Sequence, residues 1–345
     1  MHYNKLILIL IFFLTGCYQN ETMQKKDYIF GTIVEVTIYG ETEDNATHAI
    51  DLVFNEFHRL HRYLHPWEKS IVQDINQSIK NQEIYTTQDE EIFSIIKHNQ
   101  ELELKTHGYF NPAIGKLIQA WGFHADQFAT DRPNSSLIDN LQRNLPHMSE
   151  INLHNGYIGS KNKNIQLDLG GYAKGYALDQ AKKILRENNI NNALINIGGN
   201  ILALGLHGDR HWVVGIQNPR KPSPIASIIL KPGWSIGTSG DYQRYFIVDN
   251  QRYSHLIDPN TGYPANNSQS ATILFPPTES SGTLSDVYSK PLFIAPERLK
   301  YSLAKELGID FYMIVMADGK ISISSSMLNL IKWHEKIDEN NITVH

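Results

Sequence analysis

Hydrophobic and polar positions change their period several times along the chain, and these changes predict an alternation of strands and helices. Alternating positions indicate half-buried strands, and apolar residues at steps of three and four indicate helices with one buried face. The run from Ala49 to Leu64 is the clearest helical stripe, and it ends before Pro66. The expected strands cover residues 29–39, 165–169, 193–197, 212–217, 225–230, 245–249, 254–257, 271–275 and 311–316, and the expected helices residues 45–65, 87–107, 114–121, 172–189 and 298–307.

The middle of the chain shows the most regular succession of these patterns. A strand at 165–169 is expected to lead through Gly170-Gly171 as a tight turn into a helix and then into the strand 193–197. Short strands separated by Gly, Pro and Asn turns follow. We find no internal repeat, and the mixture predicts an α+β fold.

The N-terminus has a pattern of its own. The apolar run Leu6–Leu14 follows a short polar start that contains Lys5. It is too short for a membrane-spanning helix, which needs about 20 residues, and it has the length of the apolar part of an export signal. Leu14-Thr15-Gly16-Cys17 resembles the lipobox of bacterial lipoproteins. We therefore predict a signal peptide at 1–16, a lipidated Cys17 and a polar tether at 17–27; the alternative is an ordinary secretory signal.

Composition narrows the classes of site that the chain could contain. Apolar residues make up 41% and charged residues 19% of 345 residues, which is typical of a globular protein. The net charge of -5 gives no support to a nucleic-acid partner. With one cysteine, an intrachain disulfide and a multi-cysteine metal site are excluded.

The strongest local motif is Asp168-Leu-Gly-Gly-Tyr-Ala-Lys-Gly175. Two glycines before a helix let a ligand approach the backbone, and the helix N-terminus and Lys174 both favour an anion such as phosphate. A Gly-Gly turn with a purely structural role explains the same residues about equally well. Two further polar segments, His255–Gly262 and Ser285–Lys290, are candidates for chemistry, although Asp286 could simply cap a helix.

Nine motifs in this order resemble the ApbE family, the FAD:protein FMN transferases once called thiamine-biosynthesis lipoproteins. The resemblance extends from about residue 28 to 320. The motifs are Phe30-Gly-Thr32, Gly108-Tyr-Phe-Asn-Pro112, Ala120-Trp-Gly-Phe123, Asp168 to Gly175, Asn196-Ile-Gly-Gly199, Trp212-Val-Val-Gly-Ile-Gln-Asn-Pro-Arg220, Thr238-Ser-Gly-Asp-Tyr242, His255 to Gly262 and Ser285 to Lys290.

The resemblance implies a fold and an organisation. It implies a single α+β catalytic domain of the ApbE type, T-fold-like, with mixed sheets and flanking helices. We expect this domain at residues 28–330 and a C-terminal tail at 331–345. The lipobox and the resemblance together predict an exported lipoprotein that faces the periplasm, on the inner rather than the outer membrane.

The resemblance also implies an activity. Such an enzyme splits the pyrophosphate of FAD and transfers FMN to a Thr or Ser hydroxyl of a partner, typically a subunit of a membrane redox complex, with release of AMP and with Mg²⁺ as cofactor. His255 is the expected base. The positions that match FAD contacts are Phe30, Trp67, Tyr109, Phe110, Asn111, Asp168, Lys174 and Ile257. Asp286 matches the metal carboxylate, and Gly171 matches a metal-binding carbonyl.

Two positions depart from the family pattern. Lys290 stands where a Thr or Ser hydroxyl usually binds the metal, and Asn111 stands where Asp is usual. A charged lysine cannot bind Mg²⁺. Three explanations stay open: the Lys290 ammonium partly replaces the metal, the metal is held by Asp286, Ser289, Gly171 and water, or catalysis is lost while flavin binding is kept.

Alternatives to the transferase differ in what they do with FAD. One is a non-catalytic flavin-binding lipoprotein, one a pyrophosphatase that hydrolyses FAD to FMN and AMP, and one a solute-binding lipoprotein without flavin chemistry. Ser268–Thr272 is the nearest match to an acceptor motif, but it lacks the glycine, so we expect no self-flavinylation.

Overall fold

A nine-stranded sheet forms the centre of the molecule in a computed structural model that describes residues 22–125 and 131–345. Its order is β1-β2-β6-β7-β10-β15-β16-β17-β19, and all neighbours are antiparallel except the parallel pair β17 and β19. The strands are β1 (Thr22–Ile29), β2 (Thr32–Tyr39), β6 (Ala193–Ile197), β7 (Asn200–Leu204), β10 (Ser235–Gly240), β15 (Ser268–Phe275), β16 (Phe311–Met316), β17 (Ile321–Ile323) and β19 (Ile342–Val344).

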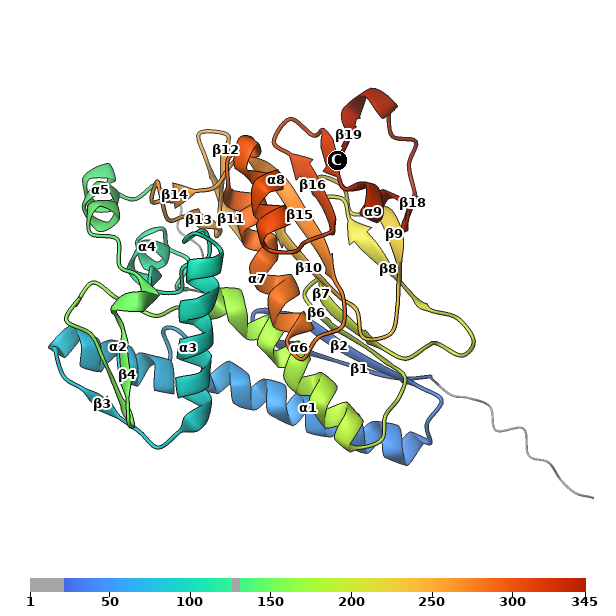
Figure 1. Cartoon of the computed structure of the whole chain (residues 1–345), viewed down its shortest axis with the longest axis horizontal. Coiled ribbons are helices and arrows are strands. Elements are labelled where there is room, and N and C mark those ends of the chain that lie inside the picture. Colours follow the sequence, from blue (N-terminus) through green and yellow to red (C-terminus); the bar gives the residue numbers. More distant parts are fainter. Residues whose placement is uncertain (1–21, 126–130) are drawn as a thin grey trace, which may run out of the picture.

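Three helices, α1 (Glu43–Tyr63), α6 (Gly170–Glu187) and α7 (Ser281–Ile294), lie against one face of this sheet (Figure 1). The apolar stripe of α1 is buried as its periodicity predicts, and the Thr42 hydroxyl caps its first turn by accepting from the Asn45 N–H. Every residue of α7 except Leu284 is buried. The helix α7 is therefore the inner helix of this layer.

The opposite face of the sheet is covered by a small sheet in the order β18-β9-β8, made of β18 (Ile331–Trp333), β9 (Pro224–Leu230) and β8 (Trp212–Gln217). Along β8, Trp212, Val214 and Ile216 are buried while the residues between them are exposed. This period of two places one face of β8 in a second hydrophobic core against β7, β10 and β16.

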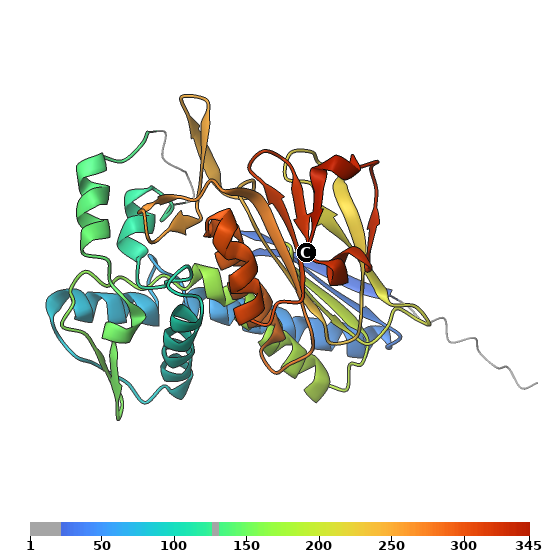
Figure 2. The same ribbon diagram turned by 45° about the horizontal axis from the view of Figure 1, so that its top comes forward.

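The remaining elements flank these layers. They are α2 (Ile71–Asn81), α3 (Glu90–Lys105), α4 (Gly115–Ala120), α5 (Ser135–Arg143), α8 (Glu297–Glu306), α9 (Ser325–Leu328), the 3-10 turns η1 (Met148–Glu150) and η2 (Glu339–Asn341), a sheet of β3 (Tyr85–Thr86), β5 (Tyr157–Gly159) and β4 (Asn152–His154), and the pairs β11 (Tyr245–Val248) with β12 (Gln251–Ser254) and β13 (Ile257–Asp258) with β14 (Tyr263–Pro264). The β11–β12 hairpin projects from the body of the molecule (Figure 2).

Glycines let α6 and α7 approach each other closely. A Cβ atom on Gly175 would lie 2.6 Å from the carbonyl oxygen of Gly282, and one on Gly282 would lie 2.7 Å from the carbonyl oxygen of Gly175. No side chain fits into these gaps without a shift of the backbone. The two helices run antiparallel, so the first turn of α6 faces the C-terminal half of α7.

The α+β expectation is confirmed, and β8 and β16 have the predicted bounds. The predicted tether is wrong in its last part, because residues 22–27 belong to β1 and pair with β2. The predicted strand at 29–39 is a hairpin, because Phe30 and Gly31 both have positive φ, as a tight two-residue turn requires. The predicted tail contains β18 and β19, each hydrogen-bonded into a sheet.

The segment expected as a strand at 165–169 is also different. It makes a single bridge with Ile114, and Gly170 and Gly171 are the first residues of α6 rather than a turn before it. The helix α2 was not predicted. The expected signal peptide, Cys17 and the start of the tether lie outside the described residues.

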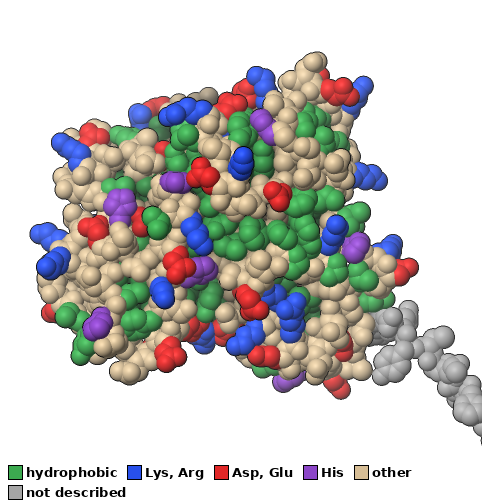
Figure 3. Space-filling view, in the orientation of Figure 1, with side chains coloured by type: hydrophobic (Ala, Val, Ile, Leu, Met, Phe, Trp, Pro, Cys, Tyr) green, Lys and Arg blue, Asp and Glu red, His purple; other side chains and the backbone are tan. Residues whose placement is uncertain are grey.

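Within the residues that are described, no helix has both the length and the apolar character needed to cross a bilayer. Acidic and basic side chains are interspersed over the face seen in Figure 3, in keeping with the modest net charge of -5.

Candidate functional site

His255 lies directly after the β11–β12 hairpin, at the base of its second strand. Its Nδ1 is 3.1 Å from the carbonyl oxygen of Arg244, and its backbone N–H donates to the same oxygen at 3.0 Å. Because a carbonyl can only accept, Nδ1 carries the proton and Nε2 keeps its lone pair. The hairpin therefore holds the ring in the tautomer that a general base needs.

Three cations surround His255. Removal from water lowers the pKa of His255 to about 3, and the charges of Arg244, Lys174 and Lys290 contribute to that shift. Burial likewise lowers the pKa of Lys174, which Asp286 opposes and the cations of Lys290 and Arg244 reinforce. These positive charges come from α6, α7 and the hairpin, so only the tertiary fold brings them together. Such a cluster is suited to a polyanionic ligand.

Lys174 stands in the first turns of α6, where the N–H of the first residue, Gly170, already donates to the Asp168 carboxylate. Helix N-termini carry free N–H groups and a partial positive charge, which favour phosphate. Among the described residues, no hydrogen bond or ion pair holds the Lys174 ammonium, although its side chain is half-buried. Its charge therefore faces the site without a partner of its own.

Asp286 and Lys290 form a buried ion pair one turn apart on α7. The Lys290 Nζ lies 2.7 Å from Asp286 Oδ1 and 2.8 Å from the Asp286 carbonyl oxygen. The other carboxylate oxygen, Oδ2, accepts the backbone N–H of Gly175 at 3.0 Å. Asp286 is in the middle of α7 and is not a helix cap, which excludes the structural alternative considered for it.

The residues expected to hold Mg²⁺ do not offer it an open set of oxygen ligands. Both Asp286 oxygens have partners, and the Ser289 hydroxyl donates to the Asp286 carbonyl at 2.8 Å and contacts Ser239 Oγ at 2.7 Å. The Lys290 side chain packs over Gly171, where a Cβ atom would meet Lys290 Cε at 2.8 Å. No group of three His, Cys, Asp or Glu side chains in the described part of the chain could hold a metal. The geometry does not fit a divalent cation.

Asp168 ends the segment before α6 and is buried. It accepts from His124 Nε2 at 2.8 Å and from the Gly170 N–H at 2.8 Å. Burial by itself would raise the pKa of Asp168, but the hydrogen bond and charge of His124 outweigh it and hold that pKa below its usual range. The His124 Nδ1 is buried without a partner in the described residues.

A row of aromatic rings leads from the β1–β2 turn to this dyad. Adjacent ring centroids are 4.6 to 5.6 Å apart along the row. The Arg244 guanidinium lies 6.0 Å from the centroid of the Trp67 ring. The rings of the row, in order, are Phe30, His61, His65, Trp67 and His124. A planar ligand ring could stack against such a wall.

The remaining predicted contact residues have mostly structural partners. Asn111 is buried, donates to the Pro146 carbonyl at 2.9 Å and accepts the Ala113 N–H at 2.9 Å. Phe110 packs 3.4 Å from the position of a Cβ on Gly171, and Tyr109 is half-buried beside it. Ile257 lies in a hydrophobic cluster with Trp121 and Phe123. Of these contacts, that of Phe110 lies at the start of α6, next to Gly171.

Comparisons with known proteins identify the family of this chain. The family model described as the ApbE family matches residues 30–313, most of the chain. The chain belongs to the ApbE family. A relative named FAD:protein FMN transferase from Rhodobacter capsulatus is 32% identical over 300 residues, which are 87% of this chain and 56% of that protein. The chain thus spans little more than half the length of that relative.

Two further ApbE relatives agree with the family assignment. A FAD:protein FMN transferase from Treponema pallidum is 26% identical over 331 residues, covering 89% of this chain and 88% of that protein. The crystal structure of an ApbE protein from Thermotoga maritima superposes with a TM-score of 0.81 at 29% identity, covering 90% of this chain and 99% of that chain. The fold described above is therefore the ApbE fold.

Two functional residues, Arg244 and His124, were not singled out from the sequence. Arg244 follows the ApbE motif Thr238–Tyr242 by two residues, and His124 follows Phe123 directly. The available signal in the sequence was therefore their position next to a motif. For His124 this signal was weak, because the chain contains fifteen histidines. Only the fold shows that the Arg244 carbonyl contacts His255 Nδ1 and that His124 binds Asp168.

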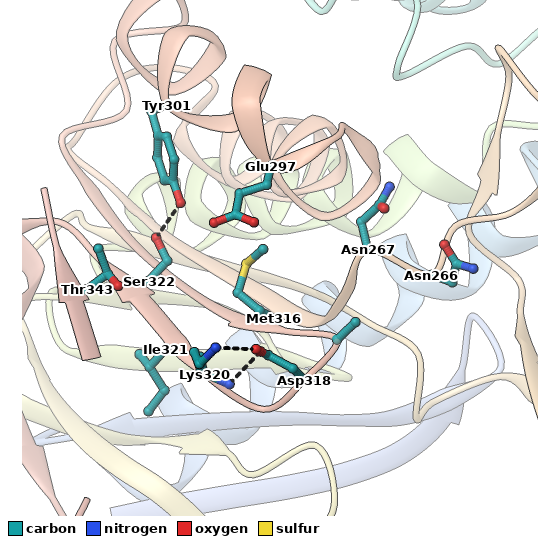
Figure 4. Close-up of a pocket in the computed structure, with 11 residues that line it drawn as sticks. Asn266, Asn267, Glu297, Tyr301, Met316, Asp318, Lys320, Ile321, Ser322 and Thr343 are labelled. Atoms are coloured by element: carbon teal, nitrogen blue, oxygen red, sulfur yellow. Dashed lines mark hydrogen bonds and ion pairs between the residues drawn. The ribbon is translucent and has the colours of Figure 1, made fainter. Parts of the chain in front are cut away.

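A cavity of about 300 Å³ lies away from this site, between α8, β16, β17 and β19. Figure 4 shows its polar wall, where the Ser322 and Tyr301 hydroxyls are 3.3 Å apart and Lys320 pairs with Asp318. A second cavity of about 370 Å³ lies along the far side of α6. Neither contains His255, Lys174 or Lys290.

Proposed function

We propose that this chain transfers FMN from FAD to a hydroxyl group of a partner protein and releases AMP. The observation that carries the proposal is His255, whose Nδ1 is held by the Arg244 carbonyl and whose Nε2 is left to accept a proton, with Arg244, Lys174 and Lys290 acting on the ring as positive charges. A dianionic pyrophosphate is the part of FAD that such a cluster would bind. Membership in the ApbE family, with its relatives named FAD:protein FMN transferase, supports the same reaction.

The transfer forms one bond to phosphorus and breaks another. The acceptor hydroxyl oxygen forms a bond to the phosphorus on the FMN side, and its proton passes to His255 Nε2. The bond from that phosphorus to the bridging oxygen breaks, and AMP leaves with the electron pair. One phosphoester forms for one phosphoanhydride broken, and one proton is released. Lys174 and Arg244 stabilise the negative charge that develops on the phosphate oxygens.

The low pKa of His255 fits this sequence of events. Before FAD binds, burial and, to a smaller extent, the charges of Arg244, Lys174 and Lys290 lower the pKa of His255 and keep the ring neutral, so its Nε2 can accept a proton. A bound pyrophosphate neutralises those cations and raises the pKa of His255 toward the range in which a general base is effective. Substrate binding therefore activates the base.

The aromatic row from Phe30 to Trp67 is the place that we propose for a ring of FAD. In this proposal Asp168 and His124 bind polar atoms of the nucleotide, and Tyr109 and Phe110 close the side of the site. Mg²⁺ stays a prediction from the family resemblance. The proposed transfer does not use it, because the side-chain oxygens of Asp286 and Ser289 already have hydrogen-bonding partners.

We further propose that the chain is exported and held at the inner membrane by lipid on Cys17, where a redox-complex subunit with a reactive Thr or Ser is the acceptor. The lipobox-like Leu14-Thr15-Gly16-Cys17 supports the anchor. Metabolic labelling with palmitate, compared between wild type and Cys17→Ser, tests it. Label retained in the variant would contradict lipidation at this residue.

The activity is tested by coexpressing the full chain with a candidate redox subunit and examining a denaturing gel for flavin fluorescence. A fluorescent acceptor band together with AMP is expected. AMP without a band would instead identify an FAD pyrophosphatase, and FAD binding without AMP a flavin-binding protein. A fluorescent band from the enzyme alone would contradict the expected absence of self-flavinylation.

A further inference from the structure

We propose that the ammonium of Lys290 is a cation built into the site, so that this chain binds the pyrophosphate of FAD without a divalent metal ion. The inference deepens the proposed function and rests on it in one respect, the identity of the anion. It concerns a departure within the family, because an oxygen ligand is usual at the position of Lys290.

The position of the ammonium carries the first step of the argument. Lys290 Nζ contacts both Asp286 Oδ1 and the Asp286 carbonyl oxygen, at 2.7 and 2.8 Å. The same carboxylate is the one that would otherwise bind a metal. An ammonium group has three N–H donors, and these contacts use two of them. Within the described residues, the third N–H has no partner and can donate to a phosphate oxygen.

The second step is that the surrounding residues leave room for the Lys290 side chain and hold its partner Asp286 in place. The side chain of Lys290 passes directly over Gly171, whose missing Cβ leaves room for Cε. The Gly175 N–H holds the second oxygen of Asp286 at 3.0 Å and so orients the carboxylate toward the ammonium. The Lys290 side chain is only 10% exposed. A metal at Asp286 would have to displace a buried, doubly hydrogen-bonded ammonium.

The third step concerns net charge. A divalent ion beside one carboxylate leaves one positive charge, whereas an ammonium beside one carboxylate leaves none. Lys174 and Arg244 add two further positive charges, which both act on His255. The site therefore stays attractive to a pyrophosphate when no metal is present.

The experiment compares the purified full chain with Lys290→Thr, which introduces the hydroxyl that the family resemblance implies, and Lys290→Met, which removes the ammonium but keeps a long side chain. Lys183→Thr on the exposed side of α6 is the matched control. Two quantities are measured: binding of Mn²⁺ alone by electron paramagnetic resonance, and the Kd for FAD with EDTA or with Mg²⁺. Thermal unfolding checks that each variant is folded.

We expect wild type and the control to bind no Mn²⁺ at millimolar concentration and to keep the Kd for FAD within about twofold between EDTA and Mg²⁺. Lys290→Met should bind FAD about tenfold more weakly in either condition, because one charge-assisted hydrogen bond is lost. Lys290→Thr should bind Mn²⁺ and should bind FAD at least about tenfold more tightly with Mg²⁺.

The proposal is overturned if wild type binds Mn²⁺ as tightly as Lys290→Thr does, or if EDTA abolishes its FAD binding. These readouts need no folded variant of Lys290→Met. They also separate this inference from the proposed function. Metal-independent FAD binding without labelling of any acceptor would contradict only the transferase, and labelling that requires Mg²⁺ would contradict only the role of Lys290.

Discussion

The two ends of the α6–α7 interface use the same residue types for different purposes. At the end formed by the start of α7, Asp179 Oδ1 accepts the Gly282 N–H, and Oδ2 accepts both the N–H and the hydroxyl of Thr283, all at 2.7 to 2.8 Å. Lys182 donates to the carbonyls of Thr278 and Glu279 and lies 3.4 Å from Asp179. Both charges have several partners, and the network links one helix to the other, although burial still raises the pKa of Asp179 above its usual range.

At the opposite end, Asp286 and Lys290 also form an ion pair, but N–H donors of the nearby ammonium groups stay without a partner in the described residues. Lys290 keeps an N–H without a partner among the described residues, and Lys174 faces the same space with none. Removal from water lowers the pKa of Lys174, so the fold keeps it there at a cost in free energy. A saturated network stabilises the fold, whereas an unsaturated one is ready to bind an anion.

The largest effect is expected from His255→Gln. It removes the proposed base at the unsaturated end, so FMN transfer should fall about 100- to 10,000-fold while the Kd for FAD changes less than about threefold. Transfer is measured by flavin fluorescence of the acceptor. His107→Gln, at an exposed histidine, is the control. Transfer at the wild-type rate in His255→Gln would show that another group accepts the proton.

The next effect is expected at the saturated end. Asp179→Asn introduces an amide that cannot accept all of the hydrogen bonds at Gly282 and Thr283, so the free energy of unfolding should fall by about 3 kcal/mol. Urea unfolding measures it. Asp51→Asn, at an exposed ion pair, should change it by less than about 0.5 kcal/mol. Equal losses in the two variants would show that the Asp179 network adds no more stability than an exposed ion pair.

Lys174→Gln should weaken FAD binding but, unlike Asp179→Asn, should not lower the stability of the fold. The Kd for FAD should rise about 10- to 100-fold, since a charge-assisted contact with phosphate is lost. The midpoint of thermal unfolding should stay the same or rise, because a half-buried cation without its own partner is removed. Lys183→Gln is the control, and both quantities are measured by fluorescence. A clear loss of stability in Lys174→Gln would show that its charge holds the fold together.

A further effect is a pH dependence from His255. The pKa is about 3 in the folded chain and about 6.5 in the unfolded chain, so only the unfolded chain gains a proton between these values. Its contribution to stability is therefore complete above pH 6.5 and is lost as the pH falls, by at most about 1.4 kcal/mol per pH unit.

Urea unfolding from pH 7 to 4.5 measures this contribution as a difference between two chains. His255→Gln lacks the titrating group, so the wild type should lose more stability than the variant over this range. Parallel curves would show that His255 titrates in the folded chain as it does in the unfolded one.

Much of the fold and part of the site could be predicted from local pattern. The stripe of α1 and the bounds of β8 and β16 follow from periodicity, which acts within one element. Residues 22–27 have no such pattern, and they form a strand because β2 offers them hydrogen-bonding partners. The family resemblance placed Gly171 and Lys290 in one site, but the packing of the Lys290 side chain over Gly171 joins residues distant in sequence and does not follow from local pattern.

The sequence by itself determined the family, the main helices and strands, and the residues His255, Lys174, Asp286 and Lys290 as candidates for chemistry. Only the tertiary structure decided how they act. It places the Arg244 carbonyl against His255 Nδ1, His124 against Asp168, and the Lys290 ammonium against Asp286 and over Gly171. The physical reason is that charge and hydrogen bonding depend on distance in space, and the α6–α7 crossing sets those distances through Gly175 and Gly282.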